Sequence, residues 1–202
     1  WIMAYTTIDN PELHFQVKTY SGDGSAQSIT LDGDEDMQPD FIWGKRRNSS
    51  AAHELYDSVR GTTKYLISNS TAAEDTNTNG ISAFNSDGFT LAGNSSINNG
   101  TIVAWCWKAG GSASSDSNGS ITSSVSANTT AGFSIVAYTG NETAGATVGH
   151  GLGAVPQTYW VKSRSVGDGW RVYHHKVSSD PETDYLVLNN DNANADSHGY
   201  WN

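Results

Sequence analysis

Apolar and polar residues alternate with a period of two along much of the chain. Near the start, Phe15, Val17 and Thr19 alternate with Gln16 and Lys18. Similar short runs, rich in aromatic and β-branched residues, lie at 41–43, 65–67, 133–136, 158–161 and 185–188. Because a strand points alternate side chains to opposite faces, these runs predict many short strands.

One run differs because both of its alternating faces are apolar. It extends from Ile102 to Trp107 and is expected to be a strand packed on two sides. Only residues 53–59 and 71–75 are expected to form helical turns. Short strands separated by Gly and Asn turns favour an all-β fold built from β-sandwiches.

The chain repeats itself. Phe15, Tyr20 and Gly22 recur as Phe133, Tyr138 and Gly140, in each case 118 positions later. Further matches pair Pro39 with Pro156, Trp43 with Trp160, Lys45 with Lys162, Tyr56 with Tyr173, Tyr65 with Tyr185, and Asn69 with Asn189. A period of this length is that of a domain and not of a solenoid or propeller unit. We therefore predict tandem β-sandwich modules.

Three parts follow from the repeat. We expect an N-terminal segment plus first β-sandwich repeat at 1–108, a connector rich in Gly, Ser and Asn at 109–131, and a second repeat at 132–202. Within the connector, residues 109–119 are expected to be flexible or loosely ordered. The second repeat is expected to be truncated at its C-terminal end, because it stops near the point equivalent to Gly80. Met3 followed by Ala4 resembles a natural start.

Charge and cysteine content exclude several classes of function. The formal net charge is −10 over 202 residues, and the only basic run is 45–47. Nucleic acid and anionic membranes are therefore not expected as partners. Cys106 is the only cysteine, so it forms no internal disulfide, and its apolar surroundings predict a buried thiol. No stretch has the length of a membrane span.

Several stretches resemble metal or cofactor sites without completing one. Residues 32–36, Asp-Gly-Asp-Glu-Asp, begin like a calcium loop but lack its glycine and its bidentate glutamate. In 53–57, Asp57 stands where a zinc-protease helix has its second His, so we expect Asp57 to pair with Arg60 or cap its turn. His174 and His175 are expected to face opposite sides of a strand.

Catalytic signatures are also incomplete. The glycines at 149–153 partly fit a dinucleotide fingerprint, but Pro156 and a strand follow where a helix would have to begin. No nucleophile elbow or phosphate loop occurs in the sequence, and no acidic pair is singled out by its spacing. We expect neither an enzyme nor a bound cofactor or metal.

Aromatic residues supply the remaining candidates. Tyr and Trp rings stack on sugars and fill protein interfaces, with Asn, Ser and Gly as adaptable neighbours. The predicted contacts with a glycan or partner are Trp170, Tyr173, His174, Tyr200 and Trp201. The alternative for each ring is that it belongs to the core.

Several separated segments together resemble a family of virion proteins of marine, cyanophage-like bacteriophages, which are described as tail-fibre-like. The segments are Tyr5-Thr-Thr-Ile-Asp-Asn-Pro-Glu-Leu-His-Phe15, Gln38-Pro-Asp-Phe-Ile-Trp43, Leu55-Tyr-Asp-Ser-Val-Arg-Gly61, Ser86-Asp-Gly-Phe-Thr90 and Val103-Ala-Trp-Cys-Trp-Lys-Ala-Gly-Gly111. The resemblance implies a lectin-like jelly roll at the virion surface, on tail or capsid. It implies no catalytic residues.

From these observations we expect a structural phage protein. The first hypothesis is a tail-fibre or adhesion component that binds host-surface glycan. The alternative is a capsid decoration protein that contacts other virion proteins through its N-terminal segment. The docking residues would then be Tyr5, Ile8, Leu13 and Phe15. The third hypothesis is a polysaccharide depolymerase. A homo-oligomer, expected to be a trimer, fits the first two.

Overall fold

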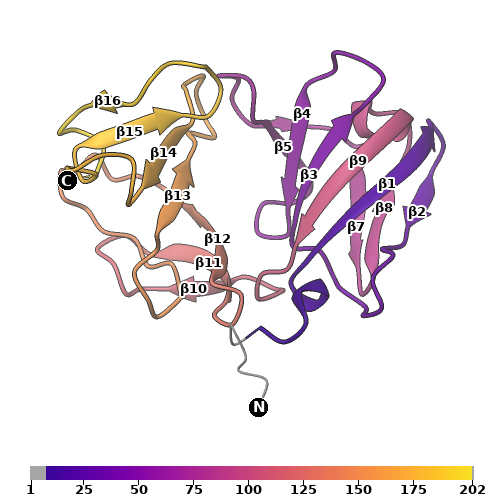
Figure 1. Ribbon diagram of the computed structural model, residues 1–202, viewed down its shortest axis with the longest axis horizontal. Helices are drawn as coiled ribbons and strands as arrows, with labels where there is room; N and C mark the ends of the chain where they lie inside the picture. Colours follow the sequence, from indigo (N-terminus) through magenta and orange to yellow (C-terminus); the bar gives the residue numbers. More distant parts are fainter. Residues whose placement is uncertain (1–7, 202) are drawn as a thin grey trace.

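The computed structural model describes residues 8–201 and shows an all-β protein in two halves (Figure 1). Its helical content in this range is two short 3-10 turns, η1 (Pro11–Leu13) and η2 (Ser96–Asn98). The first half contains β1 to β9 and the second contains β10 to β16. The all-β prediction is confirmed.

Six strands of the first half form one antiparallel sheet with the order β1-β9-β3-β4-β5-β6. Their bounds are β1 Phe15–Asp23, β9 Asn99–Trp107, β3 Phe41–Arg46, β4 His53–Asp57, β5 Gly61–Ile67 and β6 Asp75–Thr76. The predicted two-sided strand, β9, lies between β1 and β3. One of its faces, with Ile102, Ala104 and Cys106, lies in the core, and the other carries Trp105 and Trp107, which pack against other aromatic rings.

A second sheet packs on the inner face of the first. It consists of β2 (Gln27–Ile29), β8 (Gly88–Leu91) and β7 (Ile81–Asn85). The core between the two sheets includes Ile42 and Tyr56 from the large sheet and Phe89 and Leu91 from the small one, all 0% exposed. Cys106 lies in this core as predicted. The first half is therefore sandwich-like.

The second half has two smaller antiparallel sheets. One contains β10 (Ser114–Asp116), β11 (Ser123–Asn128) and β12 (Phe133–Tyr138), and the other contains β13 (Thr158–Val161), β14 (Arg171–His174), β15 (Asp184–Val187) and β16 (Ala195–Asp196). The predicted connector at 109–131 contains β10 and β11. In β11, the buried Ser126 hydroxyl accepts the Gly110 N–H and donates to the Gly111 carbonyl, which ties this strand to the segment that leads into β10.

The meanders β3–β6 and β13–β16 pair their strands in the same relative register. In the first meander Ile42 pairs with Tyr56, and in the second Tyr159 pairs with Tyr173. Each residue of the second pair lies 117 positions after the matching residue of the first pair. The pairs Leu55–Leu66 and Tyr65–Asp75 likewise correspond to Val172–Leu186 and Tyr185–Ala195. We call residues related in this way counterparts.

The two meanders contact each other through their outer faces. Trp170 packs on Leu55 and Leu66, and its indole N–H donates to the Ile67 carbonyl at 2.9 Å. The counterparts Trp43 and Trp160 meet edge to face, with ring centroids 5.8 Å apart. These contacts join the second meander to β4 and β5.

Polar contacts fix the same junction at two further points. Arg164 donates two hydrogen bonds to the Glu74 carboxylate, at 2.8 and 2.9 Å. The buried Asp40 carboxylate accepts the backbone N–H groups of Ala109 and Gly111 at 2.9 and 3.1 Å. Because Asp40 precedes β3 directly, it holds the start of the second half against the large sheet.

The predicted helical turns are not present. Residues 53–57 form β4, and Asp75 begins β6. In β4, Glu54 and Tyr56 point into the sandwich while His53 and Leu55 point to the outer face, so both faces have packing partners. Asp57 does pair with Arg60, as predicted, in the turn that follows.

Candidate ligand-binding surfaces

Seven aromatic rings, in two groups of contacting rings, line the outer face of the large sheet, and we call them the aromatic band. Its members are Phe15, Phe41, Trp43, Trp105, Trp107, Phe133 and Trp160. Strand register builds it, because Trp107 lies between Phe15 and Phe41, and Trp105 lies between Val17 and Trp43. Phe133 and Trp160 are added from the second half.

Exposure within the band is highest at its two ends, at Phe15 on β1 and at Trp160 from the second half. Leu55, where the second meander packs, is 1% exposed, whereas Phe15 and Val17 are 37% and 46% exposed. Trp160 is 42% exposed, and Trp43 and Trp105 are half-buried. An apolar surface that is partly exposed in this way is a candidate binding site for a ligand or a protein.

His53 supplies a polar group beside the band. Its Nδ1 accepts the indole N–H of Trp43 at 2.9 Å, so the neutral ring carries its proton on Nε2. Burial and the nearby Lys45 ammonium lower the pKa of His53 below its usual value. At neutral pH the imidazole is therefore uncharged and can donate a hydrogen bond from Nε2.

A second aromatic group covers the opposite face of the second meander, which we call the tyrosine face. Tyr159 and Tyr173 stack with centroids 4.6 Å apart, and Trp201 meets both rings edge to face. Burial, with Tyr173 adding to it, raises the pKa of Tyr159 to about 12. Both phenols are half-buried, so the face is only partly covered.

Arg171 extends the tyrosine face. Its guanidinium lies 4.8 Å from the ring centroid of Tyr200 and 5.4 Å from that of Tyr185, within the range of cation–π contacts. Tyr200 and Tyr185 in turn meet at 4.6 Å. The face thus combines four tyrosines, one tryptophan and one arginine.

The structure brings together three of the five predicted contact residues, Tyr173, Tyr200 and Trp201, on the tyrosine face. Trp170 is 6% exposed and packs between the two halves, so its ring is not available as a contact surface. His174 is exposed and lies on the other side of β14 from Tyr173.

The N-terminal docking residues are placed in part. Tyr5 lies outside the described residues. Ile8 is half-buried, while Leu13 and Phe15 are 38% and 37% exposed. Phe15 belongs to the aromatic band through its contact with Trp107 at 4.8 Å, so this predicted docking segment runs into the band.

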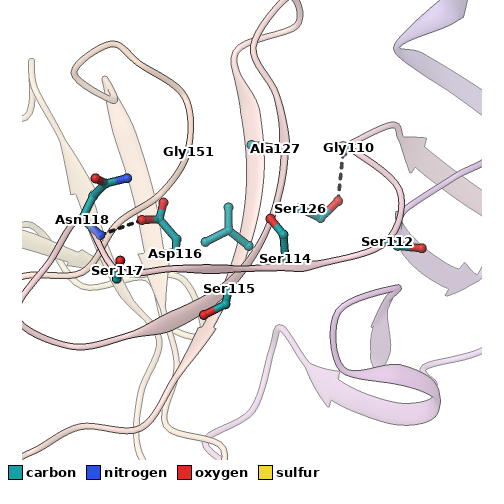
Figure 2. A pocket seen from close by; sticks show the side chains of 11 residues that line it. Gly110, Ser112, Ser114, Ser115, Asp116, Ser117, Asn118, Ser126, Ala127 and Gly151 are labelled. Carbon is teal, nitrogen blue, oxygen red and sulfur yellow. Dashed lines mark hydrogen bonds between the residues drawn. The ribbon is translucent and has the colours of Figure 1, made fainter.

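A serine-rich hollow of about 390 Å³ lies over β10 and β11 (Figure 2). Its most buried hydroxyl, that of Ser126, bonds the Gly110 N–H and the Gly111 carbonyl. The Asp116 carboxylate accepts the backbone N–H of Asn118 at 2.8 Å. Because these groups hold turns of the chain, we assign the hollow a structural role.

The incomplete metal motifs do not assemble into a site. Within residues 8–201, no group of three or more His, Cys, Asp or Glu side chains is placed to hold a metal ion. The prediction that His174 and His175 face apart was wrong: β14 ends at His174, and the two rings stack at 5.0 Å. No helix in the described range could cross a membrane.

Sequence reasoning missed the aromatic band as a surface. Phe41 and Trp43 were placed on a short strand, and Trp105 and Trp107 on a strand packed on two sides, because an apolar run looks the same whether its second face meets protein or solvent. The available signal was the alternation itself, which put Trp43, Trp105 and Trp107 on faces opposite to Ile42, Ala104 and Cys106.

A family described as Domain of unknown function (DUF7483) matches residues 10–202, which is nearly the whole chain. Among curated proteins and among solved structures, no chain is significantly similar to this one. The chain belongs to the DUF7483 domain family.

Proposed function

We propose that the chain is a carbohydrate-binding module, built from tandem sandwich-type repeats, of a virion surface protein that attaches to host glycan. The observation that carries the binding role is the aromatic band. It exposes Phe15, Val17 and Trp160 beside Trp43 and Trp105 in a chain that is otherwise acidic and polar. The virion setting, the jelly-roll fold and a trimeric assembly rest on the sequence resemblance alone.

The chemistry of the band suits a sugar. Indole faces offer flat apolar surface to the C–H face of a pyranose ring, and a few polar groups at the edge bond its hydroxyls. His53 donates from Nε2, and Thr19 lies in the same row across the sheet as Val103 and Lys45. A sugar chain lying along the band would find both kinds of contact.

The net charge of the module limits the class of glycan that it is expected to bind. A formal net charge of −10 repels polyanions over long range, and the Lys45 ammonium is already bonded to the carbonyls of Arg46, Ser49 and Ala51. We therefore propose a neutral glycan in preference to an acidic one.

The test is a titration of the chain with soluble neutral and acidic polysaccharides, followed by tryptophan fluorescence and calorimetry. Trp160→Ala should weaken binding about tenfold, equivalent to about 1.4 kcal/mol, because a stacking ring is lost. The matched control is Trp201→Ala on the tyrosine face, which should bind like the parent. Absence of binding to every neutral polymer, or equal loss in both variants, would refute the proposal.

A second candidate, capsid decoration, is favoured by the exposed Leu13 and Phe15. Their apolar side chains at the end of the band could contact a neighbouring virion protein. Electron microscopy of the particle distinguishes the two: density at the tail periphery supports attachment, and hundreds of copies on the head lattice support decoration.

A further inference from the structure

A cavity of about 580 Å³ lies at one end of the aromatic band, and we call it the end cavity. It lies between the two halves of the chain, where ligand sites commonly form, and its volume falls within the range of about 300–1,000 Å³ found for such sites. Its lining includes Leu13, His14, Gln38, Asp40, Lys108 and Asn128.

The end cavity continues the aromatic band. Three lining residues are direct chain neighbours of band members: His14 of Phe15, Asp40 of Phe41, and Lys108 of Trp107. These three rings lie in one row across the large sheet, because Trp107 pairs with both Phe15 and Phe41. The fourth ring of this group, Phe133, pairs with Asn128. The cavity therefore follows directly after one group of rings.

A fixed segment of backbone lies at the same end. Residues 108–111 leave the end of β9 and cross toward β10 in the second half (Figure 1). The buried Asp40 carboxylate holds this segment from the side of β3, through two backbone N–H groups. The Ser126 hydroxyl of β11 accepts the Gly110 N–H at 2.9 Å and holds it from the other side (Figure 2). A ligand lying along the band thus meets this segment beyond the rings.

Two polar groups of the cavity suit hydroxyl ligands. The Asn128 Oδ1 atom accepts the Ala131 N–H at 3.0 Å, so the Asn128 amide nitrogen donates to His14 Nδ1, also at 3.0 Å. The neutral His14 ring therefore carries its proton on Nε2, which is a donor. Gln38 donates from Nε2 to Asp40 at 3.0 Å, which leaves its Oε1 atom as an acceptor.

Lys108 adds a charged donor. Its backbone is fixed, because its N–H donates to the His14 carbonyl at 2.9 Å and its carbonyl accepts from Asn128 at 3.3 Å. Its ammonium takes part in none of the ion pairs formed within residues 8–201. The cavity thus offers both donors and an acceptor, and a sugar hydroxyl can use both kinds of partner.

We propose that the end cavity binds the terminal sugar residue of a glycan whose following residues lie along the aromatic band, so that the chain recognises glycan ends. An internal residue would have to continue through the segment 108–111, whereas a terminal residue ends before it. The terminal residue also has an additional free hydroxyl for His14, Gln38 or Lys108. This inference rests on the proposed glycan-binding function and adds which part of the glycan is bound.

The first experiment compares intact and shortened polysaccharides. A linear β-glucan, a mannan and a galactan, all neutral, are partly hydrolysed and added to the full chain at equal mass. End recognition predicts that the amount of chain bound at saturation, measured by calorimetry, doubles each time the mean polymer length is halved. An unchanged or smaller amount would overturn this inference and leave glycan binding itself intact. Absence of binding to every polymer would instead refute the proposed function, and this inference with it.

A substitution tests the cavity itself. Lys108→Met keeps a long side chain but removes the ammonium, and it should weaken binding of a short oligosaccharide of the bound polymer about tenfold, because a hydrogen bond from a charged donor is lost. The matched control is Lys176→Met, at an exposed lysine outside the cavity, which should bind like the parent. Unchanged binding by Lys108→Met, or an equal loss in both variants, would overturn the assignment of the cavity.

Discussion

The meanders β3–β6 and β13–β16 share their register but differ in what covers them. On the inner face of the first, a small sheet buries Ile42 and Tyr56 completely. On the matching face of the second, Tyr159 and Tyr173 are half-buried under Trp201. Strand pairing thus fixes which residues share a face, while the neighbouring layer decides whether that face is core or surface.

The outer faces differ less, because they pack on each other. Trp43 and Trp160 are counterparts and meet directly, and Leu55 has the counterpart Val172, which is 8% exposed. A shared apolar interface keeps both faces apolar. The inner faces have separate surroundings, and there Glu54 is replaced by Arg171.

The largest expected effect comes from breaking the junction between the meanders. Trp170→Ala should lower the free energy of unfolding by about 3–5 kcal/mol, because it removes a buried indole that contacts Leu55 and Leu66. Denaturant unfolding followed by circular dichroism measures this loss. Trp160→Ala, at a site 42% exposed, should lose much less, and equal losses would contradict the assignment of Trp170 to the core.

The next largest loss of stability is expected at Glu54, compared with its counterpart Arg171. Glu54→Ala should cost about 2–3 kcal/mol, because the buried hydroxyl of Tyr56 and the half-buried hydroxyl of Ser96 lose their hydrogen-bond acceptor. Burial and Glu54 raise the pKa of Tyr56, so this phenol remains a donor across the pH range of the measurement. Arg171→Ala should cost about 1 kcal/mol or less, since its ion pair with Asp168 is exposed.

A smaller effect concerns Gly80 and Tyr200, which lies 120 positions later in the chain. A Cβ atom at Gly80 would lie 2.3 Å from the Tyr56 hydroxyl oxygen, so Gly80→Ala should cost about 1–3 kcal/mol through overpacking. Tyr200→Ala removes a whole ring but from a site 40% exposed, and we expect a loss below 1 kcal/mol. Thermal unfolding of both variants gives the comparison, and a larger loss for Tyr200→Ala would contradict an open face.

The smallest effect is a pH dependence at His53. Because its pKa is lowered in the folded state, the unfolded chain binds the extra proton first as pH falls below about 6.5. Stability should therefore decline from pH 6.5 downward until the folded-state pKa is passed, and stay level above 6.5. His53→Gln should remove this component of the unfolding free energy, and an unchanged pH profile would show that His53 does not cause it.

Local patterns predicted much of the fold. The period-two runs located β1, β3, β5, β9, β12, β13 and β15, since alternation is a property of each strand alone. The repeat located counterpart strands within a residue or two. Sheet order was not predictable in the same way, because β9 pairs with β1 across more than seventy intervening residues.

The sequence did not predict strands made of polar residues, and it did not predict which distant residues pack together. Ser123 and Ser126 are 3% and 1% exposed, yet hydrophobic periodicity cannot detect a strand buried through its hydroxyls. Trp170 was predicted as a contact residue because nothing local shows that the Ile67 carbonyl, about a hundred positions earlier, accepts its N–H. Tyr173, Tyr200 and Trp201 were predicted only as separate contact residues, and the structure brings their rings together.

The central claim is that two meanders with the same strand register differ in one face, which is closed at β4 and open at β14. Amide hydrogen exchange on the unliganded chain tests this claim most directly. The amides of Leu55 and Tyr56 should exchange only through global unfolding, whereas those of Val172 and Tyr173 should exchange through local opening, faster by about a hundredfold or more. Equal protection of the two strands would contradict the account.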